Sequence, residues 1–351
     1  MRLHLPALPG QPVGGAKANS TCAFTEKIRK LPAMMKPLGY EVTVYGAESH
    51  DHEGEHVGIY PDVAPPRFTA GDWGWFNHAA AAAIRERMEP GDILGIMGGT
   101  AQKLVADFLP ELLPVEYGIG YCGSWAPYRV FESWAMYHQA NGAQYGVDSD
   151  GHFYWSVIPA YFEPERFPEN TGGAYILYLG RMTRRKGVEI VERVAQELDM
   201  PVIFAGEGEM VPEITYEKAE CLGNVGVDGR AELLSNAHCL MYPTIYTEPF
   251  GCSQTEAALC GCPTLTSPFG AYSDRGRIRQ GIDGWRCSKI GEFMWGVEHA
   301  ADLDRSEIRR HAQETYSLEA VGPLYDHYFK HLATLYGEGF YDAQPVEPVL
   351  F

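Results

Sequence analysis

Two carboxylates, Glu248 and Glu256, frame a single predicted turn in this chain of 351 residues. The apolar run at 239–242 is typical of a buried strand, and Gly251 predicts a tight turn a few residues later. A helix is expected over 252–260. One glutamate then lies in the loop and the other inside the helix, so the two carboxylates are not stacked on one helix face.

The start of this helix is a candidate anion site. Its first N–H groups, at Gly251, Cys252 and Ser253, lack partners within the helix and point out of the positive end of the helix dipole. A phosphate group suits that position, and Gly261 is expected as the left-handed residue at the other end. A strand, a glycine turn and a helix also occur in every α/β domain, so the pattern alone is compatible with a purely structural role.

A basic cluster takes a similar place earlier in the chain. The apolar run 174–179 is typical of a strand buried on both faces of a parallel sheet, and Val188 opens an amphipathic helical pattern. Between them the sequence GRMTRRKG at 180–187 carries Arg181 and Lys186. Because ligands of open α/β sheets bind at the carboxyl ends of the strands, these cations are candidates for a phosphate site, although a solvated basic surface has the same composition.

Together, the basic cluster and the sequence EPFGCSQTEAALCGCP at 248–263 resemble the motifs of the retaining glycosyltransferases of GT-B fold often written GT4. The resemblance covers about residues 157–287, and in the N-terminal half it is one of architecture. It implies that Arg181, Lys186 and Glu248 are the catalytic residues. The donor-binding residues that it implies are Arg181, Lys186, Gly206, Glu248, Phe250, Gly251, Cys252, Ser253 and Glu256.

The same resemblance implies a role for each of these groups. The two cations would clamp the donor diphosphate, Glu256 would bind ribose hydroxyls, and Glu248 would hold sugar hydroxyls near the reacting carbon. The donor would be a UDP- or GDP-sugar, used as a co-substrate, with no cofactor and no metal.

Alternating strand and helix patterns predict an α/β protein of doubly wound, Rossmann-like domains. The resemblance to the GT-B fold implies two such domains that face a central cleft. We expect an N-terminal acceptor-side domain at 1–160 and a nucleotide-sugar-binding domain at 161–316. By family analogy a final helix at 317–336 crosses back to the first domain, and 337–351 form a tail.

The first domain is expected to hold a loop and a strand end that meet the acceptor. Its predicted elements are strands at 1–8, 41–45, 92–97 and 115–120, a helix from Phe24 to Met35 capped by Ser20 or Thr21, and a helix at 76–88, with 46–75 irregular. The acceptor-side candidates are Gly14, Gly15, Tyr121 and Ser124. Many relatives carry a histidine at this strand end, where this chain offers Tyr121, Cys122 and Ser124 instead. Glu132 and His138, expected on the following helix, are second-rank candidates.

Charge and composition restrict the partners. The net charge of −18 is spread along the chain, which disfavours a nucleic-acid platform without excluding a local basic groove. The eight cysteines contain no CxxC pair and are expected as free thiols in a reducing, cytoplasmic compartment. No apolar run approaches the length that spans a membrane.

Two polar segments could suggest a metal. The histidine-rich stretch 49–56 carries imidazoles and carboxylates but lacks a ligand spacing, so it is interpreted as a polar loop. Asp148 and Asp150 look like the DxD of metal-dependent transferases, a motif of another fold, and are interpreted as a turn.

The predicted activity is transfer of a sugar from a nucleotide-sugar to an acceptor hydroxyl, with retention of anomeric configuration. The aromatic residues of the first domain favour a saccharide or small glycoside as the acceptor, with a hydroxymethylated DNA base as the alternative. A non-catalytic nucleotide-sugar binding protein, a phosphorylase and an epimerase remain open alternatives. The sequence does not give the oligomeric state.

Overall fold

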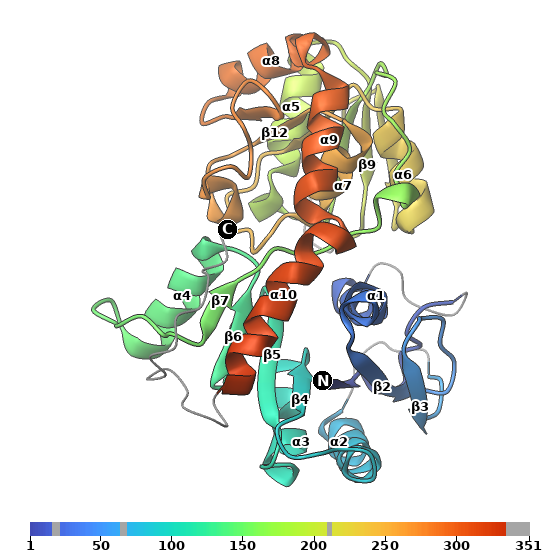
Figure 1. The fold of residues 1–351 in the computed structure, drawn as a ribbon. Helices are drawn as coiled ribbons and strands as arrows, with labels where there is room; N and C mark the ends of the chain where they lie inside the picture. Colours follow the sequence, from blue (N-terminus) through green and yellow to red (C-terminus); the bar gives the residue numbers. More distant parts are fainter. Residues whose placement is uncertain (16–21, 64–68, 209–212, 335–351) are drawn as a thin grey trace. The chain divides into compact units, whose positions relative to one another are not determined.

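The chain divides into two compact units in the computed structural model, which describes residues 1–15, 22–63, 69–208 and 213–334 (Figure 1). Unit 1 contains Met1–Glu132, Met136–Tyr161 and the chain from Leu318 on, and unit 2 contains Ser133–Ala135 and Phe162–Ser317. The predicted caps Ser20 and Thr21 and the predicted tail lie outside the described residues.

Unit 1 is built on a parallel sheet whose described strands follow the order β3-β2-β1-β4-β5-β6-β7. These strands are β1 (Arg2–Pro6), β2 (Glu41–Ala47), β3 (Glu55–Tyr60), β4 (Ile93–Ile96), β5 (Leu113–Ile119), β6 (Tyr128–Phe131) and β7 (Trp155–Val157). The helices are α1 (Ala23–Met35), α2 (Ala70–Arg85), α3 (Lys103–Phe108), α4 (Trp134–Tyr145) and α10 (Leu318–Ala333).

Helices cover both faces of this sheet. Val44 packs in one core with residues of α1 and α10, and its neighbour Tyr45 packs in a second core with residues of α2 and α3. That alternation is what a strand buried on two faces requires. The hydroxyl of Tyr40 donates to Asp326 of α10 at 2.9 Å, which ties the last described helix to this unit.

The prediction that 46–75 is irregular is wrong. Strand β3 occupies part of that segment, and α2 begins at Ala70, where Thr69 and Asp72 form a reciprocal capping box. β3 is an edge strand with half-exposed side chains, so it lacks the apolar signal of a buried strand. β6 was also not predicted, and Glu132 follows that strand rather than lying on a helix.

Unit 2 is a second parallel sheet, with its described strands in the order β10-β9-β8-β11-β12-β13. The strands are β8 (Ile176–Leu179), β9 (Val202–Ala205), β10 (Ala219–Gly223), β11 (Cys239–Tyr242), β12 (Thr264–Thr266) and β13 (Gly284–Arg286). The helices are α5 (Val188–Glu197), α6 (Val227–Ser235), α7 (Cys252–Cys260), α8 (Ile290–Glu298) and α9 (Arg305–Tyr316).

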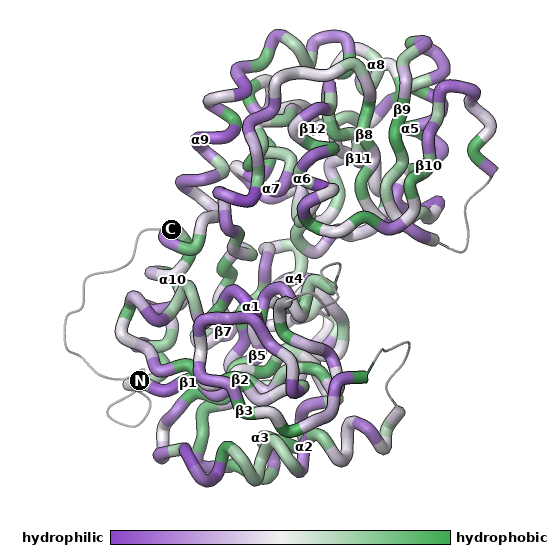
Figure 2. Tube along the Cα trace, turned by 90° about the vertical axis from the view of Figure 1, so that its right-hand side faces the viewer, coloured by the Kyte–Doolittle hydropathy of each residue, from purple (hydrophilic) through white to green (hydrophobic). Residues whose placement is uncertain are grey.

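The centre of unit 2 is apolar, as the runs of the sequence predict. Every residue of β8 and β11 is buried, and the tube through β8, β9 and β11 is largely hydrophobic in Figure 2. Both units are therefore doubly wound α/β units with parallel sheets, which confirms the predicted fold class.

Candidate donor site

Lys186 and Glu248 form an ion pair at the carboxyl ends of the unit 2 strands. Lys186 ends a short 3-10 turn after β8, and Glu248 lies in the loop after β11. Their side chains are only 14% and 11% exposed. Burial lowers the pKa of Lys186, Glu248 opposes that shift, and the nearby Arg181 and Arg185 add to it. The structure thus brings together two of the three predicted catalytic residues as a buried pair.

The two loops that carry this pair are bound to each other. The carbonyl of Arg185 accepts hydrogen bonds from the N–H groups of Ile245 and Tyr246, at 2.9 and 3.2 Å. Gly187 has a φ of 81°, and a Cβ there would lie 2.2 Å from the carbonyl oxygen of Pro243. The glycine after Lys186 therefore permits the close approach that positions the lysine beside Glu248.

A third loop holds the main chain of Glu248. The N–H of Ala271 donates to the Glu248 carbonyl at 2.7 Å, and Gly270 packs directly on the Glu248 backbone, where a Cβ would lie 2.1 Å from its nitrogen. The position of Glu248 is thus fixed by main-chain contacts on its carbonyl side.

Glu256 lies inside α7, as predicted, and its carboxylate is held by Arg230 of α6. Arg230 Nε donates to Oε2 at 2.9 Å and Nη2 to Oε1 at 2.8 Å, a bidentate pair with little exposure. Sequence analysis did not select Arg230. The two residues are 26 positions apart on different helices, so no local pattern links them.

The start of α7 has the geometry that the glycine predicts. Gly251 takes the left-handed conformation with a φ of 88°, and Gly261 does the same at the other end with a φ of 80°. No side chain in the described part of the chain caps the N-terminus of this helix. Cys252 and Ser253 are half-buried at this end.

The remaining predicted donor residues lie around this edge in different ways. Phe250 is buried, with its ring against those of Phe162 and Tyr316, so only its backbone is available to a ligand. Arg181 is exposed. Gly206 sits where β9 meets the end of β8, and a Cβ there would lie 1.9 Å from the Gly180 oxygen.

In unit 1 the predicted acceptor-side tyrosine is already engaged. The hydroxyl of Tyr121 donates to Glu116 at 2.7 Å, and the other oxygen of this fully buried carboxylate accepts the N–H groups of Trp125 and Ala126. Burial and the charge of Glu116 raise the pKa of Tyr121. Tyr121 therefore orders the loop after β5, and Ser124 is half-buried within that loop.

Gly14 and Gly15 also take left-handed conformations, with φ of 85° and 78°. A Cβ at Gly14 would lie 2.1 Å from the carbonyl oxygen of Asp51, so this glycine permits contact with the histidine-rich loop. In that loop His52 and His56 lie 3.0 Å apart between ring nitrogens, and burial lowers the pKa of His52 to about 4. Nowhere in the described residues are three potential ligands arranged to hold a metal ion.

The second-rank candidates of unit 1 differ in their surroundings. Glu132 is buried against Lys27 of α1, with 2.6 Å between Oε1 and Nζ. His138 lies exposed on α4. Glu132 is thus part of the interior of unit 1, while His138 is on its surface.

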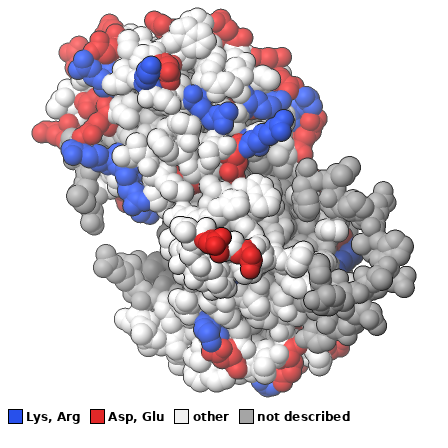
Figure 3. Space-filling view, turned by 90° about the vertical axis from the view of Figure 1, so that its left-hand side faces the viewer, with Lys and Arg blue, Asp and Glu red and all other residues white. Residues whose placement is uncertain are grey.

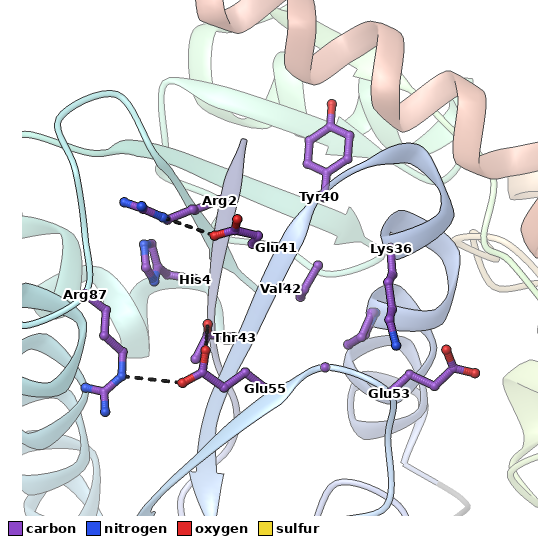
Figure 4. Close-up of a pocket in the computed structure, with 12 residues that line it drawn as sticks. Arg2, His4, Lys36, Tyr40, Glu41, Val42, Thr43, Glu53, Glu55 and Arg87 are labelled. Carbon is purple, nitrogen blue, oxygen red and sulfur yellow. Dashed lines mark hydrogen bonds and ion pairs between the residues drawn. The ribbon is translucent and has the colours of Figure 1, made fainter.

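A pocket of about 520 Å³ lies at the other edge of the unit 1 sheet, where β1, β2 and β3 begin (Figure 4). Four of its charged residues form two ion pairs, Arg2 with Glu41 and Arg87 with Glu55. None of the predicted site residues lines it. This pocket is therefore separate from the candidate donor site.

Comparison with known proteins decides the family of the segment that carries the site. Residues 161–287 match the family model of glycosyl transferases group 1. This segment is therefore similar in sequence to the glycosyl transferases group 1. All the predicted donor-binding residues lie within the matched segment, together with Arg230, which sequence analysis did not select.

Relatives and solved structures agree with this assignment. The D-rhamnosyltransferase WbpZ of Pseudomonas aeruginosa is 33% identical over 135 residues, which span 36% of this chain and 34% of WbpZ. The matched stretch is thus about a third of the curated relative.

Two solved structures share the fold over most of the chain. AviGT4, a glycosyltransferase involved in avilamycin A biosynthesis, superposes with a TM-score of 0.70 at 17% identity, covering 95% of this chain and 98% of its own. Alr3699/HepE of Anabaena, in complex with UDP and glucose, superposes with a TM-score of 0.67 at 13% identity, covering 94% and 99%. The fold is therefore GT-B.

No helix among the described residues has the length and hydrophobicity needed to cross a membrane.

Proposed function

We propose that the protein is a glycosyltransferase that takes its sugar from a nucleotide-sugar donor. The observation that carries this proposal is the buried Lys186–Glu248 pair beside α7, with Glu256 fixed in that helix, inside the matched segment. A cation, a helix N-terminus and two carboxylates supply what a diphosphate and a set of sugar hydroxyls need. The complex of HepE with UDP and glucose supports a UDP-sugar as the first donor to test.

Each residue has a role in the proposed reaction. Lys186 and Arg181 stabilise the negative charge that grows on the diphosphate as the bond from the sugar carbon to the phosphate oxygen breaks. Glu256 accepts hydrogen bonds from the ribose hydroxyls, and Glu248 holds the sugar hydroxyls while the carbon gains oxocarbenium character. Since these cations neutralise the diphosphate, the reaction requires no metal.

We propose that the anomeric configuration is retained. The acceptor oxygen bonds to the sugar carbon on the face that the diphosphate leaves, and a donor phosphate oxygen takes the acceptor proton. Glu248 is not assigned as a covalent nucleophile in this scheme, because its carboxylate pairs with Lys186.

A saccharide or small glycoside is the proposed acceptor. The stretch 136–161 of unit 1 carries aromatic residues but no Lys or Arg. On the face in Figure 3 basic side chains gather on unit 2, while much of the unit 1 surface is uncharged. Aromatic faces stack on sugar rings, whereas a DNA acceptor needs phosphate contacts and gives a steep salt dependence.

The experiment is incubation of the protein with UDP- and GDP-sugars, with saccharide acceptors or with duplex DNA containing a hydroxymethylated pyrimidine, followed by mass spectrometry. We expect release of nucleoside diphosphate and a glycosylated saccharide, whose anomeric configuration NMR then compares with that of the donor. Label only in DNA would overturn the acceptor assignment. Isomerised donor, or consumption that depends on phosphate, would reveal an epimerase or a phosphorylase, and binding without turnover would overturn the enzymatic function.

A further inference from the structure

Arg277 is a buried cation beside the start of α7. It lies between the short 3-10 turn Gly270–Ser273 and β13, and its exposed fraction is 7%. Its Nη2 donates to the carbonyl of Gly251 at 2.9 Å and to the hydroxyl of Thr255 at 2.6 Å. Arg277 therefore contacts the first turn of the helix whose N-terminus is the candidate phosphate site.

Among the described residues, Arg277 has no opposite charge to balance its own. No carboxylate in the described part of the chain forms an ion pair with it, and its Nε and Nη1 are buried without an acceptor there. Instead the guanidinium carbon lies 3.9 Å from the ring centre of Phe250 and 4.9 Å from that of Tyr316. A buried cation without a counter-charge is costly to a fold. Arg279, two residues away, is by contrast paired with Asp283 and Glu307.

A second buried polar group lies at the same place. The hydroxyl of Tyr272 is fully buried and has no partner in the described residues, and a Cβ on Gly251 would lie 2.6 Å from it. Two side chains with unused donors thus flank Gly251, the residue just before α7. Unused donors around a helix N-terminus favour a site completed by an anion.

The contact to Gly251 also has a geometric effect. In a trans peptide the carbonyl and the N–H of the next residue point in opposite directions. The Gly251 carbonyl accepts the N–H groups of Gln254 and Thr255. Arg277 adds a third hydrogen bond that keeps this carbonyl on the helix side, so the following N–H points out of the helix end. The same guanidinium adds positive charge to an end that is already positive.

We propose that Arg277 is a positioning residue of the donor site. It orients the Gly251 peptide for the donor diphosphate, and its buried charge is balanced when that dianionic group binds. This inference rests on the proposed function, because it assumes that a nucleoside diphosphate binds at α7.

The test compares Arg277→Met, Arg277→Lys and Arg279→Met with the wild type. Calorimetric titration measures the affinity for UDP and GDP, competition measures that for uridine and guanosine, and thermal unfolding measures stability. We expect Arg277→Met to bind the preferred diphosphate about tenfold more weakly or worse, the scale of one lost charge-assisted contact. Its nucleoside affinity should be unchanged, and Arg277→Lys should restore part of the lost affinity. Arg279→Met should lower the unfolding temperature and leave diphosphate affinity unchanged.

Several results would overturn this inference. One is equal diphosphate affinity in Arg277→Met and the wild type. Another is that Arg277→Met loses nucleoside affinity and diphosphate affinity equally. A third is that a lower unfolding temperature is the sole effect of this substitution. If Arg277→Met does not fold, Arg277→Lys and Tyr272→Phe are compared in its place, and unchanged diphosphate affinity in both contradicts the proposal. Failure of the wild type to bind any nucleoside diphosphate overturns the proposed function, and the inference falls with it.

Discussion

Both carboxylate oxygens of Glu256 accept hydrogen bonds from the guanidinium of Arg230, at 2.8 and 2.9 Å. Each oxygen keeps a second lone pair, so this pairing leaves room for the ribose hydroxyls proposed as its ligand. Arg230 fixes the orientation of the carboxylate in advance, which lowers the entropy lost on binding.

The first prediction is that Arg230 and Glu256 act as one unit. Arg230→Met and Glu256→Gln should each weaken nucleoside diphosphate binding by about 1.5–3 kcal/mol, the range for a hydrogen bond to a charged group. The double variant should lose little more than either single variant, as coupled partners do. Titration calorimetry on the four proteins measures this, and fully additive losses would show that Arg230 does not act through Glu256.

The second prediction concerns alkaline pH. Burial lowers the pKa of Lys186 from its ordinary 10.5, so the folded protein releases this proton at a lower pH than the unfolded chain does. Diphosphate affinity should therefore fall as pH rises, beginning below the range in which an ordinary lysine titrates. The free energy of unfolding should rise with pH in the same window, because the unfolded state there binds more protons than the folded state does.

Lys186→Arg is the matched control for this effect, since its charge persists at every accessible pH. Its diphosphate affinity should stay level over the alkaline range in which that of the wild type declines. The same alkaline decline in Lys186→Arg would assign the titration to another group.

The third prediction concerns the interior of unit 1, where Lys27 and Glu132 form a pair with side chains 8% and 4% exposed. Lys27→Met leaves a buried carboxylate without its partner and should lower the free energy of unfolding by about 3–5 kcal/mol. Adding Glu132→Gln should recover part of that loss. Denaturant unfolding measures both, with Lys103→Met as control.

Lys103 pairs with Asp107 on the surface, with the two side chains 49% and 50% exposed. Its removal should cost at most about 1 kcal/mol. A loss for Lys27→Met no larger than that of Lys103→Met would mean that the buried pair contributes no more than an exposed one.

The fourth prediction is that EDTA leaves sugar transfer, or slow donor hydrolysis, nearly unchanged, because Arg181 and Lys186 neutralise the diphosphate. The measurement is nucleoside diphosphate release with and without the chelator. Complete loss, restored by Mg²⁺ or Mn²⁺, would contradict the proposed metal independence and direct attention to Asp148 and Asp150.

The sequence predicted the elements whose signals are local. Gly251, Gly261 and the apolar run of β11 place α7 and its two ends where the structure has them. It did not predict β3 at the sheet edge, because half-exposed side chains give no apolar run. The start of α2 was also missed, although Thr69 and Asp72 form a recognisable capping pair.

The contacts that complete the site could not be predicted in the same way. Glu256 is contacted by Arg230, and Gly251 by Tyr272 and Arg277. These three residues come from other parts of the chain, and only the folded unit brings them to α7. Tyr121 illustrates the reverse case. Its place at a strand end suggested contact with the acceptor, whereas its hydroxyl donates to Glu116 of β5, five residues earlier in the chain.

The central claim is that unit 2 binds a nucleotide-sugar through its diphosphate at the start of α7. Titration calorimetry of UDP and GDP into the wild type, Lys186→Met and Glu256→Gln tests it most directly. We predict saturable binding of at least one diphosphate to the wild type and an affinity lower by about tenfold or more in each variant, all three being folded by circular dichroism. No binding to the folded wild type, or equal affinity in all three proteins, would contradict the account.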